Sequence, residues 1–291
     1  MHNFLGIIFA LTALLCWGFG DFFIQKVTRI IGSYKTLFFI GFTGLVILFP
    51  FVQHEIFNLK PINWLLLCLL GIIVIFAALF DFEALRQGKI CIVEPLLGIE
   101  LPITVGLSVT LAGEKLIPLQ WLLIAVIFIG IILAVTMHHT HLHYHKRIYE
   151  KGVILAGVGA IGMALTNFLI GISSQQISPL MTIWFTHAAA ALVTALILIY
   201  KGELRNIWQD LKKSPSLITA TGVIDNAAWV AFGYATTFIP ISIAATISES
   251  YIVLASTLGI FINKEKLKTH QIIGIILAIG GVLLLSALTS K

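Results

Sequence analysis

Long apolar runs separated by short polar segments make up most of this chain. Ten runs reach the length of about 20 residues that a helix needs to cross the hydrocarbon of a bilayer. They cover roughly residues 4–24, 34–53, 62–84, 90–112, 118–137, 152–174, 179–200, 215–235, 238–262 and 270–288. Helices are the expected form because lipid offers no hydrogen-bond partners to an open backbone. The pattern therefore predicts an all-α integral membrane protein with ten transmembrane helices.

Composition strengthens this prediction. Of 291 residues, 59% are hydrophobic and 11% are charged, whereas a soluble domain carries about 25% charged residues. The core of one soluble domain cannot bury this many apolar residues. The expected environment is therefore a lipid bilayer, with the cell (inner) membrane as the expected location. The net charge of +5 is spread over short loops, and without a basic patch we expect no nucleic-acid partner.

Lys and Arg residues are divided unevenly between the two sets of loops. Fifteen of the 18 would lie on one side of the membrane, and Lys60, Lys115 and Lys291 on the other. Cytoplasmic loops carry the excess of basic residues. The count therefore predicts that both termini face away from the cytoplasm.

The second half of the chain repeats the first. Residues 113–133, "GEKLIPLQWLLIAVIFIGIIL", align with residues 264–284, "KEKLKTHQIIGIILAIGGVLL", at a shift of 151 positions. A shift of 146 aligns earlier parts, with Asp21 over Asn167. We therefore expect a first repeat over 3–137, a linker over 138–151 and a second repeat over 152–288. Each repeat holds five runs, an odd number, so the second repeat must be inverted, as in many secondary transporters.

Motifs in both repeats resemble a known family. A turn with Gly113 and Glu114 follows Pro102 and leads into "FIGIIL"; the second repeat has "NKEKL" and "AIGGVLL", and Trp17-Gly18 lies in the first run. With these features the chain resembles the EamA branch of the drug/metabolite transporter superfamily, over nearly its whole length. The resemblance implies ten helices as two inverted five-helix repeats, alternating access, a central cavity and cytoplasmic termini. This last point opposes the loop charges.

Polar residues inside the apolar runs are the candidates for a solute or proton site. A charge at a helix centre costs about 2.5–3.5 kcal/mol, so it tends to face a cavity or a partner. The candidates for substrate binding or proton coupling are Asp225, Glu249, Glu100, Glu94, Asp21, Asn167, Asn226 and His187.

The duplication relates several of these candidates. The shift of 151 places Glu249 over Gly98, one helical turn from Glu94, so the two acids should point toward comparable places in the two halves. Asp21 and Asn167 hold equivalent positions, which fits a hydrogen bond across the pseudo-symmetry axis as well as a functional role.

Each of these assignments has a structural alternative. Asp225 and Asn226 could form interhelical hydrogen bonds that hold the bundle together. A membrane-embedded histidine such as His187 is commonly structural, although it could also relay protons. Asp81 and Glu83 stand near the end of the third run, and we expect both in the solvated interface.

Four aromatic residues, Trp17, Trp184, Trp229 and Tyr251, lie deep within the runs. Apolar packing is their ordinary role, but ring faces also bind cations. Trp229 is one turn beyond Asp225 and on the same helix face. This pair could hold an ammonium group.

These features predict a secondary transporter for a small organic solute, a metabolite, amino acid or amine that is cationic or zwitterionic. A buried carboxylic acid holds a proton more readily than one in water and could exchange it for such a solute, so protons are a candidate coupling ion. The alternatives are a broad-specificity multidrug efflux pump and a non-transporting sensor or scaffold. We expect a monomer or a homodimer.

No nucleotide loop, catalytic triad or metal-ligand cluster occurs within the runs. We therefore expect no enzyme activity, no cofactor and no metal there. The His-rich linker, "HHTHLHYH" from His138, could bind a metal, but interfacial solvation next to anionic headgroups is the simpler interpretation.

Overall fold

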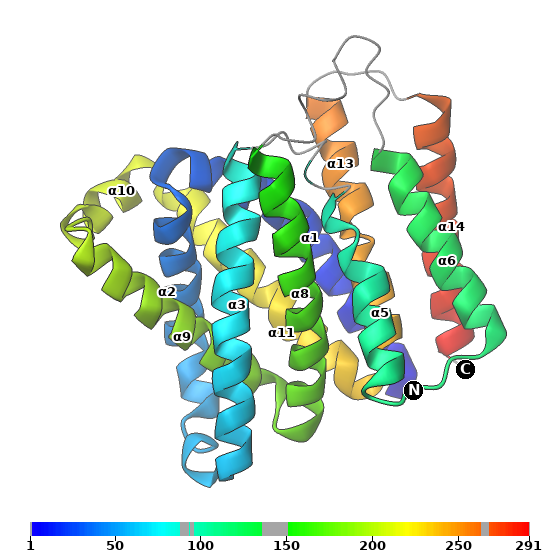
Figure 1. The fold of residues 1–291 in the computed structure, drawn as a ribbon, viewed down its shortest axis with the longest axis horizontal. Helices are drawn as coiled ribbons and strands as arrows, with labels where there is room; N and C mark the ends of the chain where they lie inside the picture. Colours follow the sequence, from blue (N-terminus) through cyan, green and yellow to red (C-terminus); the bar gives the residue numbers. More distant parts are fainter. Residues whose placement is uncertain (1, 88–92, 94–95, 136–150, 263–267, 291) are drawn as a thin grey trace.

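A computed structural model describes the chain apart from residues 1, 88–92, 94–95, 136–150, 263–267 and 291. Its regular elements within the described residues are all helical (Figure 1). The first half contains α1 (His2–Ile31), α2 (Ser33–Val52), η1 (Ile56–Asn58), α3 (Pro61–Gln87), α5 (Glu100–Thr110) and α6 (Pro118–Val135). The second half contains α8 (Lys151–Gln176), α9 (Pro179–Tyr200), η2 (Leu204–Asn206), α10 (Ile207–Lys213), α11 (Pro215–Phe238), α12 (Ile241–Glu249), α13 (Tyr251–Ile262) and α14 (Thr269–Thr289).

Several of these helices can cross a membrane. In the described part of the chain, six are long and apolar enough: α1, α2, α3, the Ile154–Gln176 part of α8, α9 and α14. Shorter apolar helices cover Pro118–Ala134 and Ile241–Ala255. The chain is therefore a multi-pass integral membrane protein, in which the other expected runs form shorter, broken or more polar helices.

The ninth expected run is a broken helix rather than a continuous one. α12 ends at Glu249 and α13 begins at Tyr251. In the first half, a turn at Gly98 and Ile99 directly precedes α5. Glu249 lies 151 positions after Gly98, so both halves break at the same place. The expectation of unbroken helices over 90–112 and 238–262 is therefore corrected.

Side-chain hydrogen bonds account for the ends of α12. At its carboxyl end, the hydroxyl of Ser250 donates to the carbonyl of Thr246 at 2.9 Å, and such local bonds compete with the regular helical pattern. At its amino end, the Glu114 carboxylate accepts from the backbone N–H groups of Ile241 and Ser242. These N–H groups have no partner within the helix. The acid of the repeated Glu-Lys-Leu motif thus caps α12.

Helices from the two halves pack in matched pairs. α1 packs along α11, α3 along α8, α2 against α9 and α6 against α14. In the repeat alignment α1 corresponds to α8 and α3 to α11, so the α1–α11 and α3–α8 contacts are equivalent to each other. The α2–α9 and α6–α14 contacts each join a helix to its own counterpart in the other half. Figure 1 shows α6 and α14 side by side at one edge, and both chain termini at one end of the bundle. This packing is what a two-fold pseudo-symmetry between the halves requires.

Glycines bring α6 and α14 into close contact. A Cβ added to Gly130 would lie 2.6 Å from the backbone nitrogen of Ala278, and one added to Gly274 would lie 2.3 Å from that of Ala134. Both distances are shorter than van der Waals contact. Small residues are the usual means of close helix packing in lipid, and larger side chains here would separate the two helices.

Candidate functional site

A cavity of about 60 Å³ lies among α1, α2, α3, α5, α8, α9, α11, α12 and the start of α13. Most of the polar residues that the sequence singles out converge on it from distant parts of the chain. Its charged, polar and aromatic lining residues are Asp21, Asp81, Glu100, Asn167, Thr186, His187, Asp225 and Glu249, with Trp17, Phe82, Trp229 and Tyr251.

Five carboxylates dominate this lining: Asp21, Asp81, Glu100, Asp225 and Glu249. Their exposed fractions lie between 1% and 6%. No lysine or arginine is among the described residues that line the cavity. A buried carboxylate is costly unless it is paired or hydrogen-bonded, so five of them around one space make it a markedly acidic site.

One of these acids pairs with the candidate amide on α8. The Asn167 amide nitrogen donates to the Glu249 carboxylate at 2.7 Å, which joins α8 to α12. The second oxygen of Glu249, the amide oxygen of Asn167 and one oxygen of Asp81 are buried and have no hydrogen-bond partner among the described residues. Such atoms are acceptors, so the site can take further donors.

His187 and Asp225 form a second pair across α9 and α11. The His187 Nδ1 lies 2.9 Å from the carbonyl oxygen of Ile183. Because a carbonyl can only accept, Nδ1 carries the hydrogen and a neutral ring presents a lone pair at Nε2. That Nε2 lies 3.6 Å from the Asp225 carboxylate. Two groups that can each accept a hydrogen bond therefore face one another between α9 and α11.

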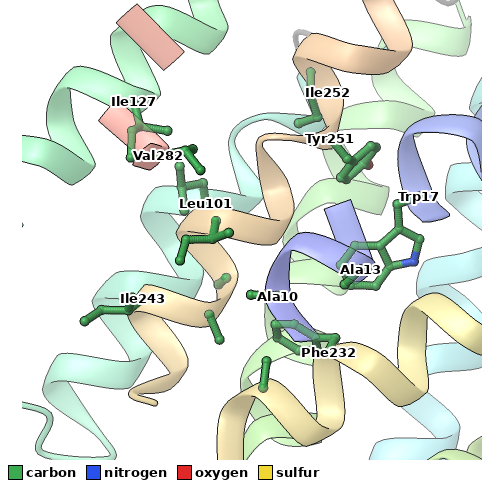
Figure 2. Close-up of a cluster of buried hydrophobic side chains, with 14 of the residues drawn as sticks. Ala10, Ala13, Trp17, Leu101, Ile127, Phe232, Ile243, Tyr251, Ile252 and Val282 are labelled. Carbon is green, nitrogen blue, oxygen red and sulfur yellow. The ribbon is translucent and has the colours of Figure 1, made fainter. Parts of the chain in front are cut away.

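Aromatic rings form the wall next to these acids. The Trp17 and Trp229 ring centroids are 4.8 Å apart at an interplanar angle of 77°. Figure 2 shows Trp17 of α1 between Phe232 of α11 and Tyr251. The Tyr251 side chain is within hydrogen-bonding reach of the Asp21 carboxylate. Acidic groups and ring faces therefore border the same space.

Comparison with known proteins decides the family. The model of the EamA-like transporter family matches residues 4–136 and 150–287. The chain belongs to the EamA-like transporter family. No curated protein matches it. A solved structure titled only "Crystal structure of protein" has a TM-score of 0.70 at 16% sequence identity, covering 98% of this chain and 99% of that one, and this likeness concerns the fold alone.

Two of the residues that the sequence suggested for the site do not line this transporter's cavity. The Asn226 amide donates to the carbonyls of Ile40, at 3.0 Å, and Gly222, at 2.8 Å, and so ties α11 to α2. The Trp184 indole donates to the carbonyl of Leu45 at 3.2 Å. Both side chains hold the bundle together. A third candidate, Glu94, lies outside the described residues, as do the linker over 138–150 and the "KEKL" segment.

Asp81 is the site residue that sequence reasoning placed elsewhere. The transporter buries it in the cavity wall, whereas Glu83 accepts from Arg86 at 2.7 Å and matches the expected interface. Positions two apart lie about 200° apart around a helix, so the two acids face opposite sides. α3 continues to Gln87, which places Asp81 deeper than a run ending at residue 84 suggests.

Proposed function

We propose that this transporter moves a small cationic or zwitterionic organic solute across the cell membrane by alternating access, and exchanges it for protons. The observation that carries the proposal is the set of five buried carboxylates around one cavity, with no basic side chain among its described lining residues except His187. Acids inside a membrane are costly and tend to serve ion or substrate pathways. In the transport cycle, protons and the organic cation would neutralise these carboxylates alternately.

The surroundings of the acids favour an amine over a bare ion. The faces of Trp17, Trp229 and Tyr251 border the acids, and aromatic faces attract ammonium groups by about 0.5–2 kcal/mol each. The carboxyl end of α12 lies at Glu249, where the helix dipole places partial negative charge. Broken helices of this kind supply ion and substrate sites in transporters with inverted repeats.

The size of the cavity supports a closed state. A volume of about 60 Å³ has room for about four water molecules, because one occupies about 10–15 Å³ of such space. A solute with several carbon atoms needs more room, so helices must separate during transport. The breaks after Gly98 and Glu249 are suitable hinges. If each repeat then adopted the conformation that the other repeat had before, the site would open to the other side of the membrane.

Uptake into proteoliposomes tests the proposal. Radiolabelled amines and amino acids are offered at two pH values, with and without a proton gradient. We expect uptake of at least one cationic or zwitterionic solute, and a loss of tenfold or more in Asp225→Asn, Glu249→Gln and Asp81→Asn. Glu55→Gln, which changes an acid outside the cavity lining, is the control. Unchanged uptake in all three cavity variants would refute the site.

A broad-specificity efflux pump is the second candidate, favoured by the cluster of Trp17, Trp229, Phe232 and Tyr251. Overexpression in a drug-sensitive host distinguishes the two functions. Resistance to several unrelated cationic drugs supports efflux, whereas competition confined to one solute class supports a metabolite transporter. Solute binding without any uptake would support a sensor.

A further inference from the structure

A second and larger cavity, of about 760 Å³, lies at one end of the bundle, where α1 and α3 end and α2 begins. It shares no lining residue with the central cavity. Polar side chains of both signs and apolar side chains line it: Arg29, Ser33, Lys35, Glu83, Arg86, Gln87, Lys201 and Glu203, with Ile30, Ile31, Tyr34, Phe76, Leu79, Phe80 and Leu155.

Positive charge predominates in this lining, with four basic side chains and two acidic ones. The acids already have partners, since Glu83 accepts from Arg86 and Glu203 lies 3.2 Å from Lys35. Lys35 also binds Asp210, an acid outside the lining that is shared with Lys213. The Lys201 ammonium group stacks over the Tyr34 ring at 4.0 Å and forms no ion pair among the described residues. By the count of its described lining residues, the cavity has a net positive charge, which suits an anionic ligand.

One face of α3 changes character along the cavity wall. Phe76, Leu79, Glu83 and Arg86 follow one another at helical spacing on the same face. The rise along the helix from Phe76 to Arg86 is about 15 Å. The Phe76 side chain is 62% exposed. A ligand lying along this face would thus contact apolar side chains at Phe76 and Leu79 and charged side chains at Glu83 and Arg86.

We propose that this cavity binds an anionic phospholipid. Its phosphate would lie near Arg29 and Lys201, and one acyl chain would run along Phe76 and Leu79. The cavity is on the side of the chain to which the sequence-based topology assigns fifteen Lys and Arg residues. Basic pockets between transmembrane helices on the cytoplasmic side are suited to anionic headgroups. A bound lipid would brace the ends of α1 and α3, which both contribute acids to the central cavity.

Lipid-dependent thermal unfolding of the full chain in detergent tests this site. The probes are phosphatidylglycerol, phosphatidylcholine of the same acyl length, and inorganic phosphate. We expect the phosphatidylglycerol to raise Tm and the other two to have little effect. In the double variant Arg29→Gln/Lys201→Gln, half-saturation should need about 30-fold more phosphatidylglycerol. Each basic residue near an anionic surface contributes about 1 kcal/mol, and 1.4 kcal/mol corresponds to tenfold.

The control is Lys60→Gln/Lys115→Gln, which removes the same charge from the opposite end of the bundle and should leave the response unchanged. Phe76→Gln, at an exposed position, tests the acyl wall and should weaken the response to phosphatidylglycerol. If the double variant does not fold, Lys201→Gln alone, also at an exposed position, should weaken it by about fivefold. Equal shifts by both lipids, a full shift by inorganic phosphate, or equal responses of the double variant and its control would each overturn the proposal.

Discussion

The hydrogen bond from Asn167 to Glu249 links two helices at the wall of the central cavity. Both side chains are at most 1% exposed, so neither finds a substitute partner in water. Nearby, one oxygen of Asp81 has no partner among the described residues. At the scale of single residues, several buried acceptors in the described part of the site have no donor, so the stability of the site depends on donors such as Asn167.

Removal of the Asn167 amide should therefore destabilise the protein. We expect Asn167→Ala to lower the free energy of unfolding by about 1–3 kcal/mol, because Glu249 loses its donor while it stays buried. A double-mutant cycle with Glu249→Ala, measured by thermal unfolding in detergent, should give a coupling energy of at least about 0.5 kcal/mol. Additive effects of the two substitutions would contradict the pairing.

Asp210 lies on the short helix α10, outside the membrane-spanning helices. Its ion pairs should make the stability of the protein depend on pH. Burial raises the pKa of its carboxyl, but the hydrogen bonds from Lys213 and Lys35 outweigh burial and hold that pKa below the ordinary value of 3.8. A lowered folded-state pKa stabilises the fold above the unfolded-state value, and this contribution is lost as the pH falls through the folded-state value.

The Asp210→Asn variant should accordingly have a lower Tm than the unmodified chain at pH 7. An ion pair of this kind contributes up to about 1 kcal/mol, which corresponds to about 2–4 °C. The difference should shrink as the pH falls below 3.8, as followed by thermal unfolding across a pH series. Glu203→Gln, which removes a more exposed partner of Lys35, is the control and should have the smaller effect. A difference that is constant with pH would contradict the ion-pair explanation.

At the scale of helices, close contacts and breaks matter more than intrinsic helix preference. α6 and α14 approach through glycines, and α12 depends on the carboxylate of Glu114 at its first turn. Such features let equivalent helices of the two halves meet and let the broken helices end beside the cavity.

Gly274→Ala should destabilise the contact of α6 with α14. The new Cβ would meet backbone atoms of Ala134 and Gly130 at 2.3 and 2.6 Å, and overpacking of this kind costs about 1–3 kcal/mol. Gly280→Ala on the same helix meets nothing within 4 Å and should be neutral or stabilising, by up to about 1 kcal/mol, because alanine favours helices. Thermal unfolding of both variants in detergent checks this. Equal losses of stability would mean that the contact is not the cause.

At the scale of the whole molecule, both termini lie at one end of the bundle (Figure 1). The opposite end carries Arg29, Lys35, Arg86 and Lys201 around the second cavity. Orientation in the membrane therefore decides which leaflet this basic end meets.

Fusions to Lys291 test the orientation. The loop charges predict that a C-terminal reporter active only outside the cytoplasm will be active, and that a cytoplasmic reporter at the same place will be inactive. The same pair of reporters placed in the basic loop after Lys201 should give the reverse pattern. A cytoplasmic C-terminus would instead match the orientation implied by the family resemblance.

The sequence by itself determined the helical class, the membrane environment, the duplication and most of the acids that reach the site. The class, the environment and the acids follow from run length, composition and the cost of charge in lipid, which are local properties, and the duplication follows from the alignment of the chain with itself. The family assignment rests on the same repeated motifs, and the match over 4–136 and 150–287 confirms it.

Only the tertiary structure decided which side of each helix faces the cavity. Lipid is as apolar as a protein core, so a transmembrane helix has no polar stripe that would reveal its inner side. Asn226 therefore could not be separated from Asp225, nor Trp184 from Trp229, until the neighbouring helices were in place. Asp81 was expected in the interface because the third run was expected to end at residue 84, whereas α3 continues to Gln87 and α8 packs along it and buries Asp81.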